Sequence, residues 1–296
     1  MINKTIFSIF KQGSRTYFYS SMFFPSYIKK EVFDLYGFVR KADNYVDSTP
    51  QNIQGFYDFK ENYYKALDGK KTDDIVINGF VDLSEKKGFD QRWTDAFLES
   101  MEMDITKTRY ETIDETLKYI YGSAEVIGLY MAKIMNLPEK SYYYAKYLGR
   151  AMQYINFIRD IAEDIELGRT YFPKEDLEKY GLKNLNKIET EQKPEEFIGF
   201  IKEQLQRYLL WQNKAEKGYN YIPKRYLIPV KTASEMYNWT AEQILKDPFI
   251  VYNKKIKPMV KQIITTTFLN VIDPKKPNYK IRPIDIIHPI PQKTIK

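Results

Sequence analysis

Helical periodicity of the apolar residues is the feature that most constrains the fold of this 296-residue chain. Apolar side chains recur at spacings of three and four in segments spread along the sequence, including residues 32–39, 117–127 and 148–155. No segment shows a period-two alternation flanked by hairpin turns. We therefore predict an all-α fold with roughly eight to ten helices of bundle length.

Glycine and proline residues divide the chain into these expected helices. Breaks are predicted at Pro25, 48–50, 68–69, 87–88, 137–138, 168–173, Gly181, 218–229 and 247–248. Prolines recur from residue 274 to residue 291 and exclude a helix there. We expect a single domain over residues 1–272, followed by a proline-rich, extended C-terminal tail over residues 273–296 that contains His288.

The composition limits the chemistry that the chain can perform. It has no cysteine and one histidine, which excludes disulfides, zinc–thiolate sites and multi-histidine metal clusters. Any metal site must therefore use oxygen ligands. No apolar run is long enough to span a bilayer, and residues 1–10 do not resemble a secretory signal, so we expect a cytoplasmic protein, with a peripheral position at a membrane surface as an alternative.

The positive charge is spread along the chain. The net charge of +7 and the pI of about 9.0 are compatible with nucleic acid, an anionic membrane or a small anionic substrate as partner. Because the basic residues do not gather in one arm, we expect general attraction of anions and no nucleic-acid partner.

Two Asp-x-x-x-Asp steps are the clearest candidates for a functional site. Asp43 with Asp47, and Asp160 with Asp164, each place two carboxylates on one face of a predicted helix. A chain with this aspartate content is expected to contain about one such step by chance, so the spacing alone is weak. Like charges four residues apart also disfavour a helix, which is typical of functional rather than structural positions.

The residues that flank the two steps make them informative. Tyr36 and Arg40 share a helix face with the first step, and Gln153 and Asn156 share a face with the second, while the rest of each helix is apolar. A solvated surface is the alternative reading of such a stripe. In a buried helix, however, a polar stripe lines a polar cavity or binds a ligand.

Four carboxylates in one cavity require cations. If the two stripes face each other, mutual repulsion raises the pKa of some of the acids unless cations lie between them. Oxygen ligands select Mg²⁺, with Mn²⁺ as an alternative, and Mg²⁺ commonly completes its coordination with water and substrate phosphates. The two steps therefore predict a metal-held diphosphate.

These motifs resemble those of the squalene/phytoene synthase family. The run Gln153-x-x-Asn156-x-x-Arg159-Asp160-x-x-x-Asp164-x-x-x-Gly168-Arg169-x-Tyr171-x-Pro173 resembles the second signature of that family, and Tyr36-x-x-x-Arg40-Lys41-x-Asp43-x-x-x-Asp47 resembles the first. Ser14-Arg15-Thr16-Tyr17 stands where the family has a serine-containing element. The resemblance covers residues 10–262 in the expected order and leaves the proline-rich tail outside.

The resemblance implies a fold, a reaction and a set of site residues. The fold is a single-domain class I isoprenoid synthase, a helical bundle around a central cavity. The reaction is the Mg²⁺-dependent head-to-head condensation of two prenyl diphosphates through a cyclopropyl diphosphate. The implied metal ligands are Asp43, Asp47, Asn156, Asp160 and Asp164, and the same aspartates count as catalytic together with Tyr36, Tyr171 and Tyr237. The implied substrate-binding residues are Ser14, Thr16, Arg40, Gln153, Asn156, Arg159, Arg169 and Lys254.

The chain length of the substrate is less constrained than the reaction. The small pair Ser20-Ser21 near the expected pocket favours two geranylgeranyl diphosphates and phytoene as product. The alternative is two farnesyl diphosphates, which give dehydrosqualene or, with NADPH, squalene. A head-to-tail prenyltransferase usually carries Asp-Asp-x-x-Asp, a form absent here. A noncatalytic membrane-surface protein leaves the polar stripes unexplained.

Overall fold

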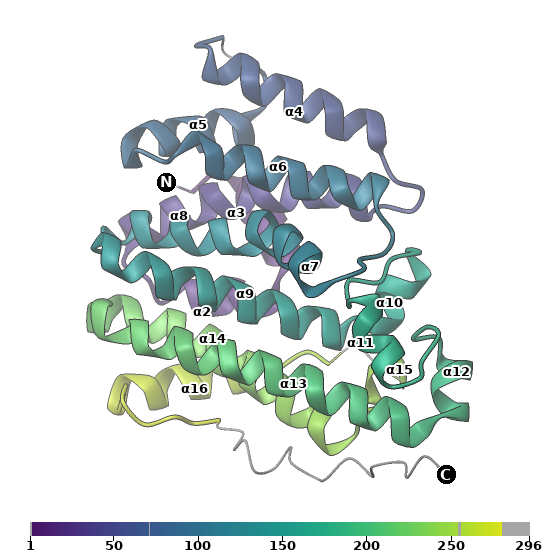
Figure 1. Cartoon of the computed structure of the whole chain (residues 1–296). Helices are drawn as coiled ribbons and strands as arrows, with labels where there is room; N and C mark the ends of the chain where they lie inside the picture. The colour runs from purple at the N-terminus through teal and green to yellow at the C-terminus, as the bar shows by residue number, and fades with distance from the viewer. Residues whose placement is uncertain (1, 71, 254–255, 280–296) are drawn as a thin grey trace.

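The computed structural model describes residues 2–70, 72–253 and 256–279, and the regular structure in this part of the chain is almost entirely helical (Figure 1). The helices are α1 (Lys4–Gly13), α2 (Arg15–Ser21), α3 (Ser26–Asp47), α4 (Ile53–Leu67), α5 (Ile75–Lys87), α6 (Gln91–Thr106), α7 (Ile113–Ile120), η1 (Tyr121–Glu125), α8 (Val126–Ile134), η2 (Glu139–Ser141), α9 (Tyr142–Arg159), α10 (Ile161–Glu166), α11 (Lys174–Lys179), α12 (Lys187–Gln192), α13 (Pro194–Glu216), η3 (Lys217–Tyr221), α14 (Lys224–Lys246), α15 (Ile250–Asn253) and α16 (Val260–Ile272). Among the described residues, β pairing is limited to an isolated bridge between Tyr110 and Pro173. The all-α prediction is confirmed.

The number of long helices agrees with the periodicity of the sequence. Within the described residues, segments of at least 13 residues are α3, α4, α5, α6, the continuous segment α7–η1–α8, α9, α13, α14 and α16, nine in all. Helix α5 shows how local residues fix the ends of a helix. Asp74 caps α5 by accepting hydrogen bonds from the backbone N–H groups of Val76 and Ile77, and Gly88 ends α5 with a left-handed φ of 59°.

One predicted break is wrong in its extent. The interruption expected over 218–229 ends at Pro223, because α14 begins at Lys224 and passes through Pro229. Pro229 removes only the hydrogen bond to the carbonyl of Arg225, and Arg225 is exposed at the first turn of the helix, so that carbonyl can be solvated.

Helix α9 is the central element of the bundle and packs against α8, η1, α13 and α14 (Figure 1). Close approach of its backbone to η1 depends on glycine. A Cβ atom added to Gly149 would lie 2.2 Å from the carbonyl oxygen of Ala124. On the other side of η1, a Cβ atom on Gly122 would lie 2.0 Å from the carbonyl oxygen of Ala96 in α6. Any larger side chain would push these helices apart, and the contact between Gly149 and Ala124 borders the central cavity described below.

The core consists of two apolar clusters. One gathers aromatic and aliphatic side chains of α1, α3, α4, α5, α6 and α8, and includes Phe38 stacked on Phe80 at 3.9 Å between ring centroids. The other gathers side chains of α9, α13 and α14 around Phe197 and Phe200. Burial of this much apolar surface is the main source of stability for such a bundle.

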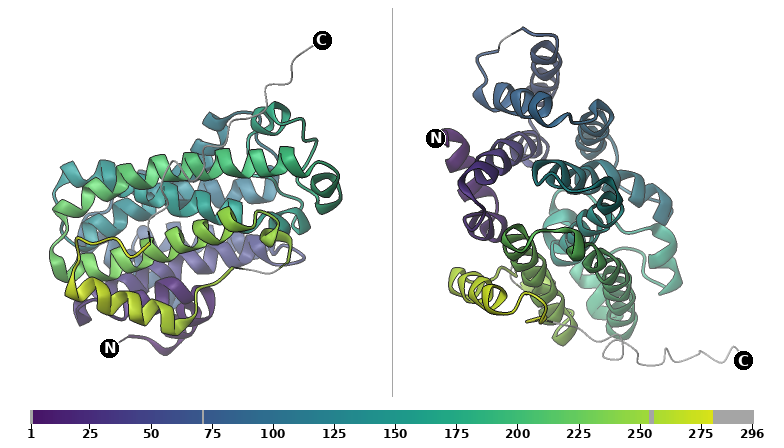
Figure 2. Two further views of the ribbon diagram at one scale, coloured as in Figure 1. Left: turned by 90° about the horizontal axis from the view of Figure 1, so that it is seen from below. Right: turned by 90° about the vertical axis from the view of Figure 1, so that its left-hand side faces the viewer.

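Helix α16 lies on the outside of the bundle against α2 and α14 (Figure 2). After Ile272 the described chain has no further helix, and residues 273–279 fold back onto α14. There the backbone N–H of Asn278 donates to Glu235 at 2.9 Å, and Lys231 donates to the carbonyl of Lys276 at 2.6 Å. Residues 280–296, with His288, lie outside the described part, so the division into a domain and a tail stays a prediction.

None of the helices in the described residues combines the length and the apolar character that crossing a membrane requires.

Candidate active site

A cavity of about 820 Å³ opens between the two apolar clusters and takes residues from both. Every predicted site residue that the structure describes lines it: Ser14, Thr16, Tyr36, Arg40, Asp43, Asp47, Gln153, Asn156, Arg159, Asp160, Asp164, Arg169, Tyr171 and Tyr237. Lys254 lies outside the described residues. The sequence motifs, which are more than 100 residues apart, therefore meet in one place.

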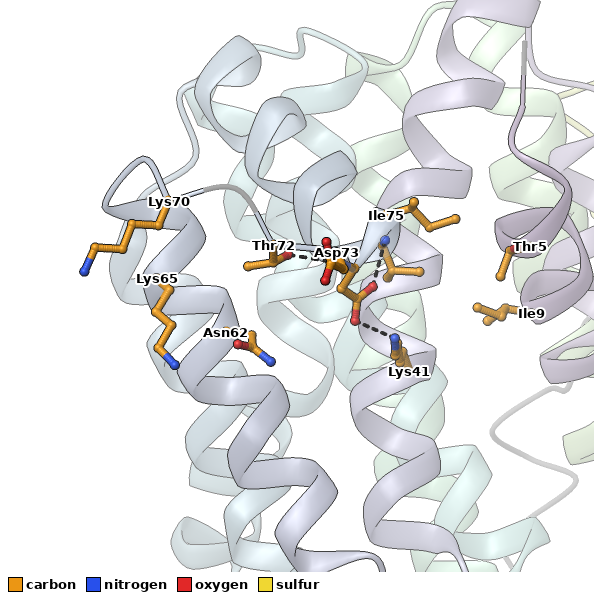
Figure 3. A pocket seen from close by; sticks show the side chains of 11 residues that line it. Thr5, Ile9, Lys41, Asn62, Lys65, Lys70, Thr72, Asp73 and Ile75 are labelled. Atoms are coloured by element: carbon orange, nitrogen blue, oxygen red, sulfur yellow. Dashed lines mark hydrogen bonds and ion pairs between the residues drawn. The ribbon is translucent and has the colours of Figure 1, made fainter.

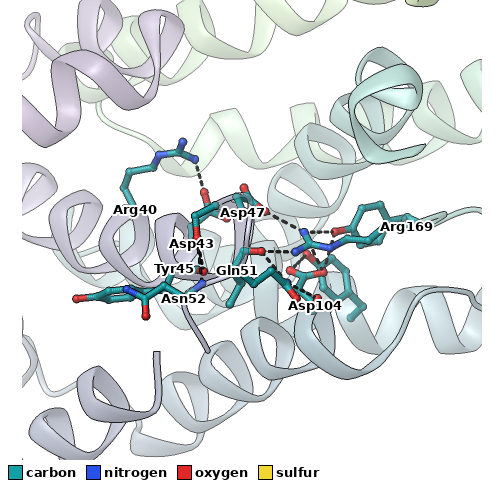
Figure 4. Close-up of polar contacts among 12 residues, drawn as sticks. Arg40, Asp43, Tyr45, Asp47, Gln51, Asn52, Asp104 and Arg169 are labelled. Atoms are coloured by element: carbon teal, nitrogen blue, oxygen red, sulfur yellow. Dashed lines mark hydrogen bonds and ion pairs between the residues drawn. The ribbon is translucent and has the colours of Figure 1, made fainter. Parts of the chain in front are cut away.

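The first acidic step forms the end of α3, where the cavity is polar (Figure 4). Arg40, one turn before Asp43, donates to its carboxylate. Asp47 is the last residue of α3 and accepts a hydrogen bond of 2.8 Å from Nη1 of Arg169, which comes from the loop after α10. Each carboxylate of this step is thus paired with an arginine.

The second acidic step does not lie on one uninterrupted helix, and this part of the prediction is wrong. Helix α9 ends at Arg159, Asp160 has φ −100° and ψ 17°, and α10 begins at Ile161 and carries Asp164. Arg159 binds the neighbouring carboxylate through Nε at 2.8 Å and through Nη2 at 2.5 Å. Consecutive side chains on a regular helix diverge, and this two-pronged pairing coincides with the interruption of the helix.

The interruption leaves the polar stripe in place. Backbone hydrogen bonds of 2.8 Å still run from the N–H of Asp160 to Asn156 and from the N–H of Asp164 to Asp160. Gln153, Asn156, Asp160 and Asp164 therefore all reach the cavity, as the helical spacing predicted.

Asp104 is a cavity residue that the motif analysis missed. It lies on α6 with 5% of its surface exposed, and its carboxylate accepts hydrogen bonds of 2.7 Å from the hydroxyls of Tyr119 and Tyr171. Nη1 of Arg169 lies 3.8 Å from it. The available signal was its place on the buried stripe of α6, seven residues after Phe97, where an apolar residue is expected.

Burial and mutual repulsion raise the pKa of three of these acids. Burial, followed by the charge of Asp47, raises the pKa of Asp43 to about 7. Burial raises the pKa of Asp104 to about 6, although Arg169 acts in the opposite direction. The pKa of Asp164 is also well above its usual value, through burial and then the charge of Asp160. The cavity therefore favours a cation or a proton at these positions.

The predicted tyrosines have different surroundings. One face of the Tyr36 ring stacks on Phe10 at 3.8 Å, and a Cβ atom on Gly13 would lie 2.5 Å from the Tyr36 hydroxyl, so this ring is held on two sides. Tyr171 stacks on Phe157 at 4.4 Å while its hydroxyl binds Asp104, which makes it a positioning residue for that acid. Tyr237 is buried, with its ring 5.8 Å from that of Tyr17.

The N-terminal element lines the cavity from α2. The Ser14 hydroxyl caps this helix by accepting a hydrogen bond of 3.3 Å from the N–H of Tyr17. Thr16 is half-buried one residue into the first turn. Both hydroxyls are placed to donate toward an anion in the cavity.

A second hollow of about 610 Å³ lies at the surface among α1, α3, α4 and the start of α5 (Figure 3). Lys41, Lys65, Lys70 and Asp73 are among its lining residues, and Lys41 is paired with Asp74. None of the predicted site residues lines it. The polar motifs therefore select the central cavity.

Comparison with known proteins shows the family of the chain. The family model of squalene/phytoene synthases matches residues 10–262. The chain belongs to the squalene/phytoene synthase family. This agrees with the resemblance of the two signatures, and the match runs from the last turn of α1 to the first turn of α16.

Relatives within the squalene/phytoene synthase family are distant in sequence. A phytoene synthase from an Oncidium hybrid cultivar is 25% identical over 265 residues, which cover 83% of this chain and 62% of that protein. A 4,4'-diapophytoene synthase from Staphylococcus haemolyticus is 26% identical over 197 residues, which cover 64% of this chain and 68% of that protein. A dehydrosqualene synthase solved with a ligand superposes with a TM-score of 0.81 at 19% identity, covering 92% of this chain and 95% of that one, which confirms the fold.

Members of the squalene/phytoene synthase family typically use Mg²⁺. In the described residues no group of three or more acidic or histidine side chains is already close enough to hold a metal, and three of the four aspartates bind arginines instead. The side-chain oxygen of Asn156, however, is buried without a hydrogen-bond partner. An orphaned amide oxygen beside several carboxylates matches the oxygen ligands that Mg²⁺ prefers, so the residues fit the ion.

Proposed function

We propose that this protein condenses two prenyl diphosphates head to head through a cyclopropyl diphosphate, and that the product is phytoene from two geranylgeranyl diphosphates. The observation that carries the proposal is the meeting of both acidic steps in one cavity that also has a large apolar wall. That wall includes Val32, Leu35, Val39, Ile127, Met131, Met135, Leu137 and Leu148. The polar part suits a diphosphate, and the apolar part suits a prenyl chain.

The acids and the amide would hold the metal. Asp43, Asp47, Asn156, Asp160 and Asp164 are the ligands we propose for Mg²⁺. When bound, Mg²⁺ would neutralise the diphosphate and make it a better leaving group. The raised pKa of Asp43 supports this assignment, because it indicates that the protein alone compensates the negative charge of this carboxylate poorly.

The arginines would exchange partners when substrate binds. Arg40 and Arg159 now bind Asp43 and Asp160. Once cations compensate these carboxylates, the guanidinium groups can turn their fixed donors to phosphate oxygens, as Ser14 and Thr16 can with their hydroxyls. Arg169 is different, because it also donates to the backbone carbonyl of Val46 and so keeps a structural role.

The apolar wall would protect the carbocation formed when the C1–O bond of one substrate breaks. Exclusion of water prevents its capture as an alcohol. The free face of Tyr36 and the ring of Tyr237 line the cavity, and an aromatic face attracts a cation. The carbon–carbon bond then forms between C1 of this substrate and the double bond of the second, with loss of a proton.

Small side chains on α2 favour the longer substrate. Ser20 and Ser21 are buried and line the cavity, and their hydroxyls donate to the backbone carbonyls of Tyr17 at 3.2 Å and Phe18 at 2.9 Å. The two side chains therefore take up little space in the cavity. Because both hydroxyls already have hydrogen-bond partners, neither leaves an unsatisfied polar group facing a prenyl chain. The names of the relatives include both phytoene synthase and 4,4'-diapophytoene synthase, so two farnesyl diphosphates remain the alternative.

The test is identification of the hydrocarbon. Purified protein is incubated with labelled C15 or C20 diphosphate and Mg²⁺, with and without NADPH, and the products are analysed by mass spectrometry. We expect phytoene from the C20 substrate without NADPH. If only the C15 substrate gives a hydrocarbon, the product is squalene or dehydrosqualene and the proposal of phytoene is wrong. Absence of diphosphate release under every condition would refute the enzyme assignment.

A further inference from the structure

Helix α16 has its polar and apolar faces reversed relative to an ordinary surface helix. The buried face consists of Ile263, Thr266, Thr267 and Asn270, three of them polar, whereas Phe268 is 59% exposed and Ile272 is 79% exposed. Ile264, Leu269 and Val271 are exposed as well. Single exposed apolar residues are common on soluble proteins, but a whole apolar helix face in contact with solvent is not.

Hydrogen bonds hold α16 in this orientation. The amide nitrogen of Asn270 donates to Glu235 at 2.8 Å and to Thr232 at 3.1 Å, and its oxygen accepts from Lys231 at 2.8 Å. All three partners are buried on α14. Rotation of α16 to bury Phe268 would leave these buried groups without hydrogen-bond partners, which is unfavourable.

The exposed face continues onto neighbouring residues. The ring of Phe23, directly after α2, lies 6.4 Å from that of Phe268, and Met22 beside it is also exposed. We call the set Met22, Phe23, Ile264, Phe268, Leu269 and Ile272 the α16 patch. Helix α2 also forms part of the cavity wall through Tyr17, Ser20 and Ser21, so the patch adjoins the site.

The charges around the patch identify its partner. Helix α16 contains no acidic residue, and exposed lysines stand at both of its ends, Lys261 in the first turn and Lys275 and Lys276 after the last, against one aspartate, Asp273. An apolar face framed by lysines matches a bilayer surface with anionic headgroups. A helix of 13 residues is about 20 Å long, shorter than the ~30 Å hydrocarbon core, so it would lie in the plane of the surface.

We propose that the α16 patch docks this protein onto the surface of an anionic membrane, with Phe268 and Ile272 inserted among the acyl chains and Lys261, Lys275 and Lys276 at the headgroups. The direct test is sedimentation of the full chain with vesicles of phosphatidylcholine alone or mixed with phosphatidylglycerol. We expect strong binding to the mixed vesicles that weakens as salt is added, because the lysine contribution is screened.

The double variant Phe268→Ser, Ile272→Ser tests the apolar contribution. We expect its partition into mixed vesicles to fall at least about tenfold, since each side chain contributes several buried carbon groups. The matched control is Ile188→Ser, Leu210→Ser, because these residues are 73% and 64% exposed on α12 and α13, away from the patch. Equal loss in both variants, or no loss in the first, would overturn the proposal. Replacing one of the three lysines with glutamine should weaken binding to the mixed vesicles by about fivefold.

A fluorescent probe distinguishes lipid from a protein partner. The chain has no cysteine, so Phe268→Cys and Leu210→Cys can each be labelled at one position with a polarity-sensitive dye. We expect a solvent-like spectrum for both in the free protein and a blue shift on mixed vesicles at position 268 only. A blue shift at position 268 before vesicles are added would show that a second copy or another segment of the chain covers the patch, and would overturn the membrane assignment. Both assays are run without substrate, so their outcome is independent of diphosphate release.

Discussion

Arg169 donates a hydrogen bond of 2.8 Å to Asp47 and so joins the loop after α10 to the last residue of α3. The two residues are 122 positions apart and belong to different sequence signatures. Arg169 also reaches the carbonyl of Val46 and the hydroxyl of Tyr171, while only 4% of its surface is exposed. This arginine therefore both shapes the polar part of the cavity and holds its two walls together.

We predict that Arg169→Gln lowers the free energy of unfolding by about 3 kcal/mol, because Asp104 then keeps a buried charge without its nearest guanidinium. Diphosphate release should be lost as well. Urea denaturation and a coupled diphosphate assay measure the two effects.

Arg40 provides the control, because its side chain is 32% exposed and pairs with Asp43 within the same helix. Arg40→Gln should change stability by less than about 0.5 kcal/mol while lowering kcat/KM at least about 100-fold. Equal losses of stability in both variants would contradict the distinction.

We predict that Asp43→Asn abolishes turnover and makes the metal-free protein more stable above neutral pH. The raised pKa of about 7 means that the folded state resists ionisation of this carboxyl. Its contribution to stability is therefore full below pH ~4 and lost as the pH rises through 7. Because the pKa rises from 3.8 to about 7, the gain from the variant should grow from pH 4 to roughly 4 kcal/mol and become constant above about pH 8.

Urea denaturation from pH 4 to pH 8 in EDTA measures this difference. Asp90 is the reference acid, because Arg92 lowers its pKa and the carboxylate caps α6. Asp90→Asn should show the opposite sign, with no gain at neutral pH. A pH-independent effect of Asp43→Asn would show that repulsion in the cavity is not its cause.

We predict that Mg²⁺ and inorganic diphosphate bind cooperatively. The positive charge of Mg²⁺ and the negative charge of diphosphate compensate each other in the cavity. Their joint effect on the midpoint of thermal unfolding should therefore exceed the sum of their separate effects. Asn156→Leu keeps the size of the side chain but removes the orphaned oxygen, and it should weaken Mg²⁺ binding at least about tenfold in calorimetry. Unchanged affinity in that variant would remove Asn156 from the proposed ligand set.

We predict that Ser21→Phe shifts the preference from the C20 to the C15 substrate, because the ring would occupy the cavity beside α2. The ratio of kcat/KM for the two substrates should change by at least about tenfold in favour of C15. Ser84→Phe is not a suitable control, because Ser84 is buried elsewhere in α5. Ser8→Phe on the exposed side of α1 is suitable, and it should leave the ratio unchanged.

Local patterns predicted the elements well and their interruptions less well. The 3.6-residue period anticipated α3, α9 and the continuous segment α7–η1–α8, because it depends only on which side chains face inward. It did not anticipate the break at Asp160, where Arg159 pairs with the neighbouring carboxylate. The sequence analysis also placed Pro229 in a break between helices, whereas α14 continues through Pro229 because its first turn is exposed.

The sequence by itself determined the helical architecture, the absence of thiolate and multi-histidine sites, and which polar residues stand in the two signatures, since composition and spacing are properties of the chain. The tertiary structure alone decided that Asp104 joins the cavity, that Arg169 connects the two acidic steps, and that α16 turns its apolar face outward. These features arise from contacts between residues distant in the chain, whose energies depend on burial and on the partners that folding brings together.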